Sequence, residues 1–247
     1  GHRAGSDAQN LHRNKRSLSL NLKTEAGYGL FLKLLATADI LVENFRAEVK
    51  YRLKIDYETL RQTHPKLIYA SISGFGQDGP YRDRPGVDQI VQGTSGLMSL
   101  TGEAEGQPMR VGIAISDTSA GMFLGQGILL ALIERSKTGA GQWVHTSLLE
   151  AMLSKLDFQA ARYTMSGESP GRVGNHHPTF SPMGVFEAAD GFVNIAASTT
   201  KMFRAFCDVL SVPQLAADAR FESGAGRLKH RDALNATINE CTRALTM

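Results

Sequence analysis

A single carboxylate, Asp117, lies between two apolar segments in the sequence GIAISDTSAGMFLGQGILLALIERSKTG (112–139). Taking a carboxylate out of water costs free energy unless neighbouring groups stabilise its charge. At the start of a helix, free backbone N–H groups and the helix dipole provide that stabilisation and keep the carboxylate ionised. An ionised carboxylate can attack a carbonyl carbon and carry an acyl group. The residues alone leave two interpretations of Asp117 open, a helix N-cap and a nucleophile.

Other side chains that often build reactive sites lack suitable partners in this sequence. His176 and His177 are adjacent, and adjacent residues rarely face one ion; no Cys, Asp or Glu completes a ligand set with them. Cys207 and Cys241 fall in helix-like segments without metal-ligand spacing, which predicts free thiols in a reducing compartment. We therefore expect no metal site.

A group of basic residues near the N-terminal end has two interpretations. It could bind phosphate, or it could form a solvated basic face; its members are Arg13, Lys15, Arg16 and Lys23. The sequence contains neither of the glycine-rich phosphate-binding motifs G-x-G-x-x-G and G-x-x-x-x-G-K-[ST]. If phosphate is bound here, a different arrangement of residues must hold it.

Composition indicates a globular protein. The chain has 247 residues, with 42% hydrophobic and 21% charged residues, which is enough for one large domain or two smaller ones with a sizeable core. A formal net charge of +3 is too small to indicate a nucleic-acid partner. No apolar run approaches about 18 uninterrupted residues, so we expect no membrane association. We see no signal-peptide pattern and expect the cytoplasm, or an organelle matrix, as the compartment.

Helical and strand-like segments alternate along the first part of the chain. We expect strands at 17–22, 39–45, 66–72 and 142–148, an extended segment at 111–116, and helices at 27–39, 57–64, 88–100, 118–136 and 150–167. Asp56 caps the second of these helices and Pro65 ends it. This alternation predicts an α/β fold, a parallel sheet with crossover helices. The Gly- and Pro-rich loop 73–86 follows a strand, where α/β proteins place ligands.

The composition changes near residue 161. The stretch GESPGRVGNHHPTFSP (167–182) is rich in Gly, Pro and Ser and indicates a linker. Beyond it, residues 184–198 predict a hairpin that turns at 189–191, and two helices follow at about 200–210 and 227–245. We expect a large α/β domain over 1–160, a linker over 161–182 and a smaller α+β domain over 183–247.

Seven stretches in series resemble one known family, the class III coenzyme A transferases, which includes formyl-CoA and carnitine CoA-transferases and 2-methylacyl-CoA racemases. The stretches are NKRSLSLNLK, DILVENFR, LIYASISGFGQDGP, GVDQIVQGTSGLM, SDTSAG, KTGAGQWV and GNHHP…PMGVFEAADGFV. They cover most of the chain in family order. The resemblance implies a Rossmann-like large domain in an interlocked homodimer. Family members are longer at both ends, so we expect this chain to be a fragment without the usual N-terminal and C-terminal segments, and therefore weakly stable.

The resemblance also implies a mechanism that needs no metal, ATP or tightly bound cofactor. The family nucleophile matches Asp117, which would form an anhydride with the acyl group of an acyl-CoA and then a thioester with CoA. A small carboxylate acceptor would finally take the CoA. Coenzyme A is thus a substrate, and the partners are an acyl-CoA donor and a carboxylate acceptor.

The CoA contacts that the resemblance implies fall in three segments. Adenine contacts match Leu20 and Lys23 in the first segment and Asn44, Phe45 and Arg46 in the second, and Arg52 matches an arginine near the CoA phosphates. In the third segment, Ser73 stands where some relatives carry lysine and Phe75 where they carry tyrosine. One phosphate contact is therefore expected to be missing.

Two alternative functions remain open. A racemase of 2-methylacyl-CoA would need acid–base groups on both faces of the α-carbon, but Val87 stands where a histidine is required and Thr199 where a carboxylate is required. These departures favour the transferase. The second alternative is a non-catalytic CoA-binding or dimerisation module.

Overall fold

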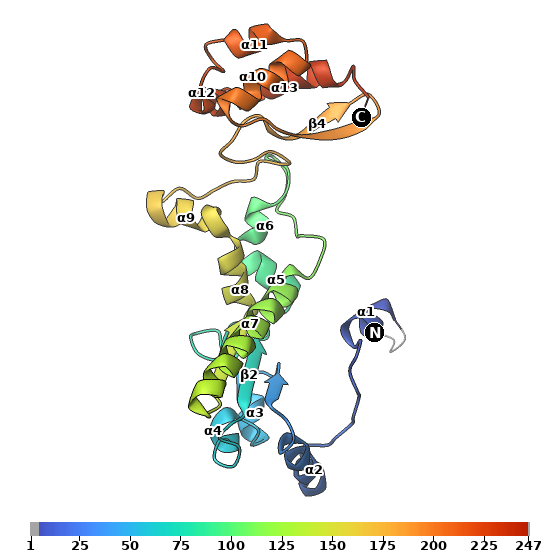
Figure 1. The fold of residues 1–247 in the computed structure, drawn as a ribbon, viewed down its shortest axis with the longest axis vertical. Coiled ribbons are helices and arrows are strands. Elements are labelled where there is room, and N and C mark those ends of the chain that lie inside the picture. The colour runs from blue at the N-terminus through green and yellow to red at the C-terminus, as the bar shows by residue number, and fades with distance from the viewer. Residues whose placement is uncertain (1–4, 247) are drawn as a thin grey trace. The chain divides into compact units, whose positions relative to one another are not determined.

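The computed structural model describes residues 5–246. The chain forms two compact units (Figure 1). The first contains the residues up to Val91 together with Ser116–Met152, and the second contains Gln92–Ile115 and the residues from Leu153 onward. The expected division at residues 160 and 183 stays a prediction.

Three parallel strands form the sheet of the first unit in the order β1-β2-β3. They are β1 (Ile40–Glu43), β2 (Ile68–Ser73) and β3 (Trp143–Ser147). In register, Ile40 lies opposite Ile68, and Tyr69 lies opposite Trp143. The expectation of an α/β fold with a parallel sheet and helices is confirmed.

One face of the sheet packs on the helices that precede and follow β1. These are α2 (Glu25–Leu35), α3 (Ala47–Arg52) and α4 (Tyr57–Leu60). Because side chains alternate along a strand, Leu41, Tyr69 and Trp143 share this face and join its core cluster. Asp56 is the N-cap of α4, and its side chain accepts a hydrogen bond from Thr59 N–H, as the sequence predicts.

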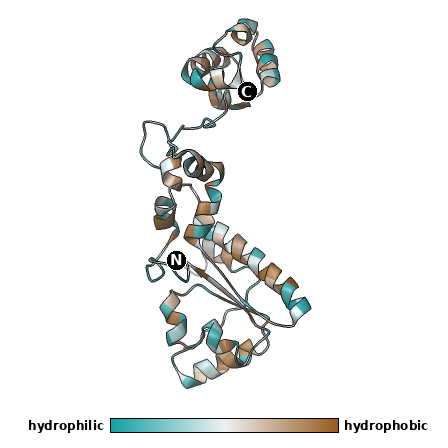
Figure 2. Cartoon of the chain, turned by 90° about the vertical axis from the view of Figure 1, so that its left-hand side faces the viewer, coloured by the Kyte–Doolittle hydropathy of each residue, from teal (hydrophilic) through white to brown (hydrophobic). Residues whose placement is uncertain are grey.

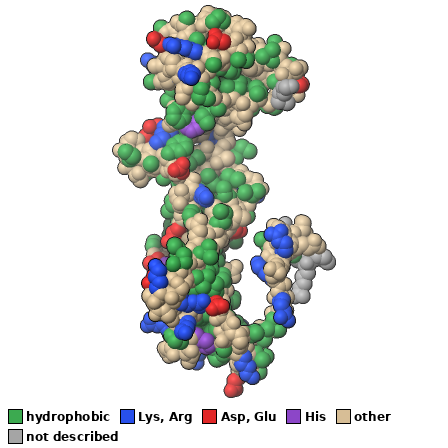
Figure 3. All heavy atoms as spheres, in the orientation of Figure 1, with side chains coloured by type: hydrophobic (Ala, Val, Ile, Leu, Met, Phe, Trp, Pro, Cys, Tyr) green, Lys and Arg blue, Asp and Glu red, His purple; other side chains and the backbone are tan. Residues whose placement is uncertain are grey.

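The helix α7 (Ile115–Thr138) is associated with the other face, where Val42, Ile72 and Val144 line pockets together with its residues. It begins before the expected residue 118, and the segment 111–116 forms no strand. Figure 2 shows apolar residues along much of α7 and polar ones at its C-terminal end. Figure 3 shows apolar side chains at the surface over α7. Its exposed apolar residues include Met122, Leu130 and Ile133.

Within the described residues, α7 is long and apolar enough to cross a membrane by length and composition alone. Core helices of soluble proteins meet the same criterion, so a single such helix is weak support for a membrane segment. The expectation of no membrane association stays a prediction.

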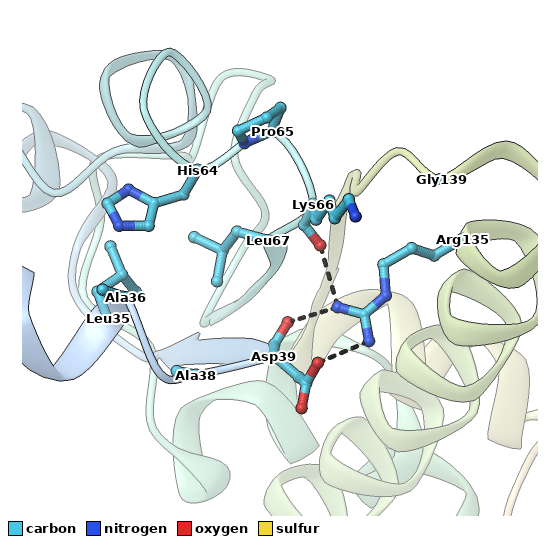
Figure 4. A pocket seen from close by; sticks show the side chains of 10 residues that line it. All are labelled: Leu35, Ala36, Ala38, Asp39, His64, Pro65, Lys66, Leu67, Arg135 and Gly139. Carbon is cyan, nitrogen blue, oxygen red and sulfur yellow. Dashed lines mark hydrogen bonds and ion pairs between the residues drawn. The ribbon is translucent and has the colours of Figure 1, made fainter.

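The C-terminal end of α7 is held to the sheet by Arg135 (Figure 4). Its guanidinium donates hydrogen bonds to the carbonyl oxygens of Asp39 and Lys66, at 3.3 and 3.0 Å, and pairs with the Asp39 carboxylate at 2.8 Å. Asp39 and Lys66 lie just before β1 and β2. The cavity of about 470 Å³ beside this contact therefore lies at the amino ends of these strands.

Three expected elements differ in the structure. Residues 17–22 form no strand, and a short helix, α1 (Ser6–Leu11), precedes them. The expected helix 88–100 is two helices, α5 (Asp88–Thr94) and α6 (Leu97–Leu100), because Gly96 lies between them at a φ of 91°. The expected helix 150–167 is also divided, into α8 (Leu148–Lys155) and α9 (Asp157–Ser166), and Asp157 has a φ of 47°.

The second unit has its own core around an antiparallel hairpin. Strands β4 (Met183–Ala188) and β5 (Gly191–Ala196) pair as expected, with the turn at residues 189 and 190. The helices are α10 (Thr200–Val209), α11 (Pro213–Ala217), α12 (Gly224–Lys229) and α13 (Arg231–Thr242). The expected helix 227–245 is thus divided at His230, and α11 was not expected. The core cluster contains Phe186, Phe203, Cys207, Leu215, Phe221, Leu234 and Ile238.

Candidate active site

A pocket of about 350 Å³ lies where all three parallel strands of the first unit end. Asn44 follows β1, Ser73 ends β2 and Gly74 follows it, and Leu148 follows β3; all four residues line the pocket. Asp117, from the first turn of α7, lines it too. Ligands of α/β proteins bind at the carboxyl ends of parallel strands. The candidate nucleophile therefore lies at the edge of the sheet where α/β proteins bind ligands.

A second pocket, of about 470 Å³, shares Asn44 and Ile72 with the first. Phe45 forms another part of its wall, and α7 supplies Gly121 and Gly125. A Cβ atom added to either glycine would have nothing within 4 Å, so the absence of side chains there leaves the surface of α7 open. Together the two pockets offer a mostly apolar surface beside the Asp117 carboxylate.

Asp117 is the third residue of α7 and not its N-cap. The N-cap interpretation is therefore wrong in its detail, although the carboxylate does lie in the first turn. Burial raises the pKa of Asp117 above its ordinary value, and the negative charge of Asp88 raises it further. These two effects oppose the dipole of α7, which favours the ionised form.

Asp88, at the start of α5, holds the first turn of α7 in place. Its Oδ1 atom accepts hydrogen bonds from the backbone N–H of Ser116 at 2.9 Å and from the Ser116 hydroxyl at 2.8 Å. Asp88 and Ser116 are both buried. Because Ser116 immediately precedes Asp117, this contact fixes the backbone that carries the candidate nucleophile.

The loop after β2 returns to the pocket through a close backbone approach. A Cβ atom on Gly74 would lie 2.5 Å from the Gly86 Cα atom, and one on Gly86 would lie 2.5 Å from the Gly74 Cα atom. Only glycine fits at both positions. The contact closes the loop 74–86 and places Val87, the last residue before α5, in the pocket wall.

The residues expected to bind CoA fall into two groups in the structure. Asn44, Phe45 and Ser73 line the two pockets at the strand ends. Lys23 and Arg52 line a third pocket of about 450 Å³, together with Lys54, which the sequence did not single out. Leu20, Arg46 and Phe75 lie outside these three pockets; Phe75 packs edge-on against Tyr81, with ring centroids 5.6 Å apart.

The sequence profile of CoA-transferase family III matches residues 2–247. The chain belongs to CoA-transferase family III. It is 43% identical over 220 residues to the succinate–glutarate CoA-transferase of Agrobacterium fabrum, covering 89% of this chain and 55% of that protein. It is 41% identical over 231 residues to the acetyl-CoA:oxalate CoA-transferase of Acetobacter aceti, covering 93% and 59%.

The fold agrees with that of a solved member of the family. The crystal structure of a CAIB/BAIF family protein from Brucella suis superposes with a TM-score of 0.81 at 38% identity, covering 94% of this chain and 61% of that one. The chain thus spans less than two thirds of the length of these relatives.

Two residues of the site were not predicted from the sequence. The first is Asp88, which lies far from Asp117 in sequence, and no motif joins the two residues. The second is the buried Lys50 on α3, for which no sequence pattern indicated a partner. A charged residue beside Val49 and Leu53 was the available signal.

The two adjacent histidines have different surroundings. His176 lies 3.3 Å from the Asn235 amide and packs on Phe186, whereas His177 packs between Phe158 and Phe180. Burial and the charge of Arg231 lower the pKa of His176. Among residues 5–246, no group of three or more His, Cys, Asp or Glu side chains could hold a metal ion.

Proposed function

We propose that this chain transfers coenzyme A between an acyl-CoA donor and a carboxylate acceptor, with Asp117 as the covalent nucleophile. The observation that carries the proposal is the placement of Asp117 in a pocket at the carboxyl ends of three parallel strands, in a member of CoA-transferase family III. Both relatives described above are named as CoA-transferases that act on carboxylates.

The reaction proceeds through four exchanges at carbonyl carbons. The Asp117 carboxylate attacks the thioester carbon of the donor, the C–S bond breaks, and CoA leaves as a thiolate. The thiolate then attacks the Asp117 carbonyl of the resulting anhydride and releases the donor as a free carboxylate. Asp117 is left as a thioester of CoA.

The acceptor reverses these exchanges. Its carboxylate attacks the aspartyl thioester carbon and expels the thiolate, which gives a second anhydride. The thiolate attacks the acceptor carbonyl of that anhydride and regenerates the Asp117 carboxylate. Every step replaces one activated acyl group with another, so the cycle consumes no ATP and transfers no net proton.

The electrostatic setting of Asp117 suits this role. Partial burial and the negative charge of Asp88 both destabilise the charged form of the Asp117 carboxylate, and this raises its pKa. Such a carboxylate is a stronger nucleophile than a fully hydrated one, because less solvation is lost as it attacks. The proposal therefore requires pH values at which Asp117 is ionised.

The phosphates of CoA are assigned to the pocket that contains Lys23, Arg52 and Lys54. Arg offers a planar set of donors that suits phosphate, and Lys adds compact positive charge. The resemblance assigns adenine contacts to Leu20, Lys23, Asn44, Phe45 and Arg46, and further contacts to Ser73 and Phe75. These assignments belong to the proposal.

Two residues support transfer over racemisation. Val87 lines the Asp117 pocket but carries no titratable group. Thr199 is the N-cap of α10, and its hydroxyl oxygen accepts a hydrogen bond from Met202 N–H at 3.2 Å. Neither side chain can move a proton at the α-carbon of a substrate.

Covalent trapping tests the proposal. The chain is incubated with succinyl-CoA or another acyl-CoA, hydroxylamine is added, and modified peptides are located by mass spectrometry. A hydroxamate at Asp117 that requires the acyl-CoA and is absent in Asp117→Asn supports the mechanism. If calorimetry shows that CoA binds but Asp117 stays unmodified with every donor, the transferase is excluded and the CoA-binding module gains support.

A further inference from the structure

A buried lysine that the proposed reaction does not use lies behind the walls of the pocket. The side chain of Lys50, on α3, is 1% exposed. Its ammonium is held by Glu43 at 3.3 Å, by the Ser71 hydroxyl at 3.4 Å and by the side-chain oxygen of Gln77. Burial lowers the pKa of Lys50, and the charge of Glu43 opposes that shift. Lysine is almost never fully buried without such partners.

Glu43 connects Lys50 to the turn after β1. Its Oε1 atom faces the ammonium and also accepts a hydrogen bond from the Ser71 hydroxyl. Its Oε2 atom accepts a hydrogen bond from the backbone N–H of Phe45 at 2.8 Å. The carboxylate therefore fixes the peptide between Asn44 and Phe45, two residues that line the pockets.

Gln77 connects Lys50 to the loop after β2. Its side-chain oxygen accepts from the ammonium, and its amide nitrogen donates to the Ser73 hydroxyl at 3.3 Å. The Ser73 hydroxyl oxygen in turn accepts from Gly76 N–H at 3.2 Å. Ser73 lines the pocket beside Asp117. The same ammonium thus reaches two separate walls of the candidate site.

Aromatic rings close the remaining sides of the ammonium. Its nitrogen lies 4.6 Å from the centre of the Trp143 ring and 5.9 Å from that of Tyr69. The Trp143 N–H donates to the Ser71 hydroxyl at 2.9 Å, which completes the network. Such contacts stabilise a desolvated cation and restrict it to one position.

We propose that Lys50 is a positioning residue, whose ammonium holds the Asn44–Phe45 turn and the Ser73–Gln77 loop in the relative placement that a CoA thioester requires. The inference rests on the proposed function for its ligand. A buried ion pair adds little net stability compared with well-packed apolar residues. The main consequence of this pair is therefore the geometry of the two segments it connects.

Gln77→Leu cuts the connection to the loop and leaves the Lys50–Glu43 pair intact. We expect a Kd for CoA about tenfold higher, because the loop must then be ordered on binding, and faster hydrogen exchange at the Gly76 amide. The melting temperature should stay close to that of the unmodified chain. Gln159→Leu is the matched control: Gln159 is also half-buried, and its oxygen accepts from a cation, Arg162, at 3.1 Å. The control should change neither quantity.

Two variants separate the positioning role of Lys50 from its effect on stability. They are the single variant Lys50→Met and the double variant that combines Lys50→Met with Glu43→Gln. The single variant leaves a buried charge unpaired and should lower the melting temperature strongly. The double variant removes both charges and should recover most of that loss, while the Kd for CoA stays about tenfold higher. Recovery of affinity together with stability in the double variant would overturn the proposal, and so would unchanged affinity and exchange in Gln77→Leu.

These readouts distinguish the failure of this inference from the failure of the proposed function. If the unmodified chain binds no CoA, the proposed function loses its ligand. Exchange at the Gly76 amide then decides whether Lys50 and Gln77 hold the loop. Faster exchange in Gln77→Leu alone supports the positioning role, and equal exchange in Gln77→Leu and Gln159→Leu overturns it.

Discussion

Asp117 and Asp88 are two carboxylates of one site with different surroundings. Asp88 is buried and receives two hydrogen bonds from Ser116. Asp117 keeps much of its surface exposed at the pocket wall, and the partial burial of its carboxylate raises its pKa. Hydrogen bonds to a carboxylate favour its charged form, while a nearby negative charge disfavours a second one. Asp88 therefore acts on Asp117 both as a backbone clamp and as a source of negative potential.

Asp88→Asn should separate these two effects. The asparagine oxygen can still accept from Ser116, but the charge is gone, so the pKa of Asp117 should fall. The rate of acylation trapped by hydroxylamine should still fall at acidic pH, but the fall should occur at lower pH than in the unmodified chain. The pH profile of trapping between pH 3.5 and about 8 measures this shift. Asp83→Asn, in the exposed loop, is the control; an unmoved acid limb in Asp88→Asn would refute the charge effect.

Asp117 should also cost the chain stability at neutral pH. Its pKa is raised in the folded state, so the folded chain binds this proton more tightly than the unfolded chain does. The protonated form stabilises the fold fully below the unfolded pKa, and this contribution is lost as pH rises through the folded pKa. Asp117→Asn should therefore raise the melting temperature at pH 7 and have little effect near pH 3. Thermal melts at both pH values measure the difference between the variant and the unmodified chain. A melting temperature of Asp117→Asn at pH 7 that is equal to or lower than that of the unmodified chain would contradict the prediction.

The residue patterns led to Asp117 but not to the groups that surround it. Family motifs locate Asp117 because the matching stretch is short and contiguous. Asp88 and Lys50 act through contacts with residues distant in sequence, such as Ser116 and Gln77, and no periodicity encodes those contacts. Sequence reasoning therefore found the candidate nucleophile and missed Asp88, which holds its backbone through Ser116, and Lys50, which contacts the walls of the pocket through Glu43 and Gln77.

At the scale of elements, the sheet and its neighbours were predicted best where burial is strongest. The strands at β1, β2 and β3 contain apolar and β-branched residues and were found close to their observed bounds. The alternation at 17–22 also suggested a strand, but among residues 5–246 no strand pairs with that segment to supply hydrogen bonds. The expected helices were divided where single residues such as Gly96 and Asp157 adopt positive φ angles, which a helical pattern does not reveal.

The attachment of α7 to the sheet should depend on Arg135. This guanidinium bonds two backbone carbonyls and the Asp39 carboxylate, and its side chain is 19% exposed, so Arg135→Met leaves those acceptors without their donor. We expect the free energy of unfolding to fall by about 1–3 kcal/mol, the usual effect of losing hydrogen bonds to a charged group. Urea unfolding followed by circular dichroism measures the change. Lys137→Met, in the same exposed last turn, is the control; a loss of equal size there would exclude a specific role for Arg135.

At the scale of the molecule, the two compact units have separate cores. Tyr69, Leu35 and Leu60 belong to the core of the first unit, and Phe186, Phe203 and Ile238 belong to that of the second. Cooperative unfolding in a single transition is typical of one core, and chains with two often depart from it. The chain contains one tryptophan, Trp143, which lies in the first unit, so its fluorescence reports on that unit alone.

Phe203→Ala should therefore affect the two units unequally. Phe203 is buried in the core of the second unit, and its truncation should destabilise that unit by about 3–5 kcal/mol. We expect the urea transition seen by circular dichroism to broaden or divide, while the midpoint of Trp143 fluorescence stays where it is. Tyr69→Ala, in the core of the first unit, should move the fluorescence midpoint instead. If Phe203→Ala shifts both signals equally, the two cores unfold as one cooperative unit.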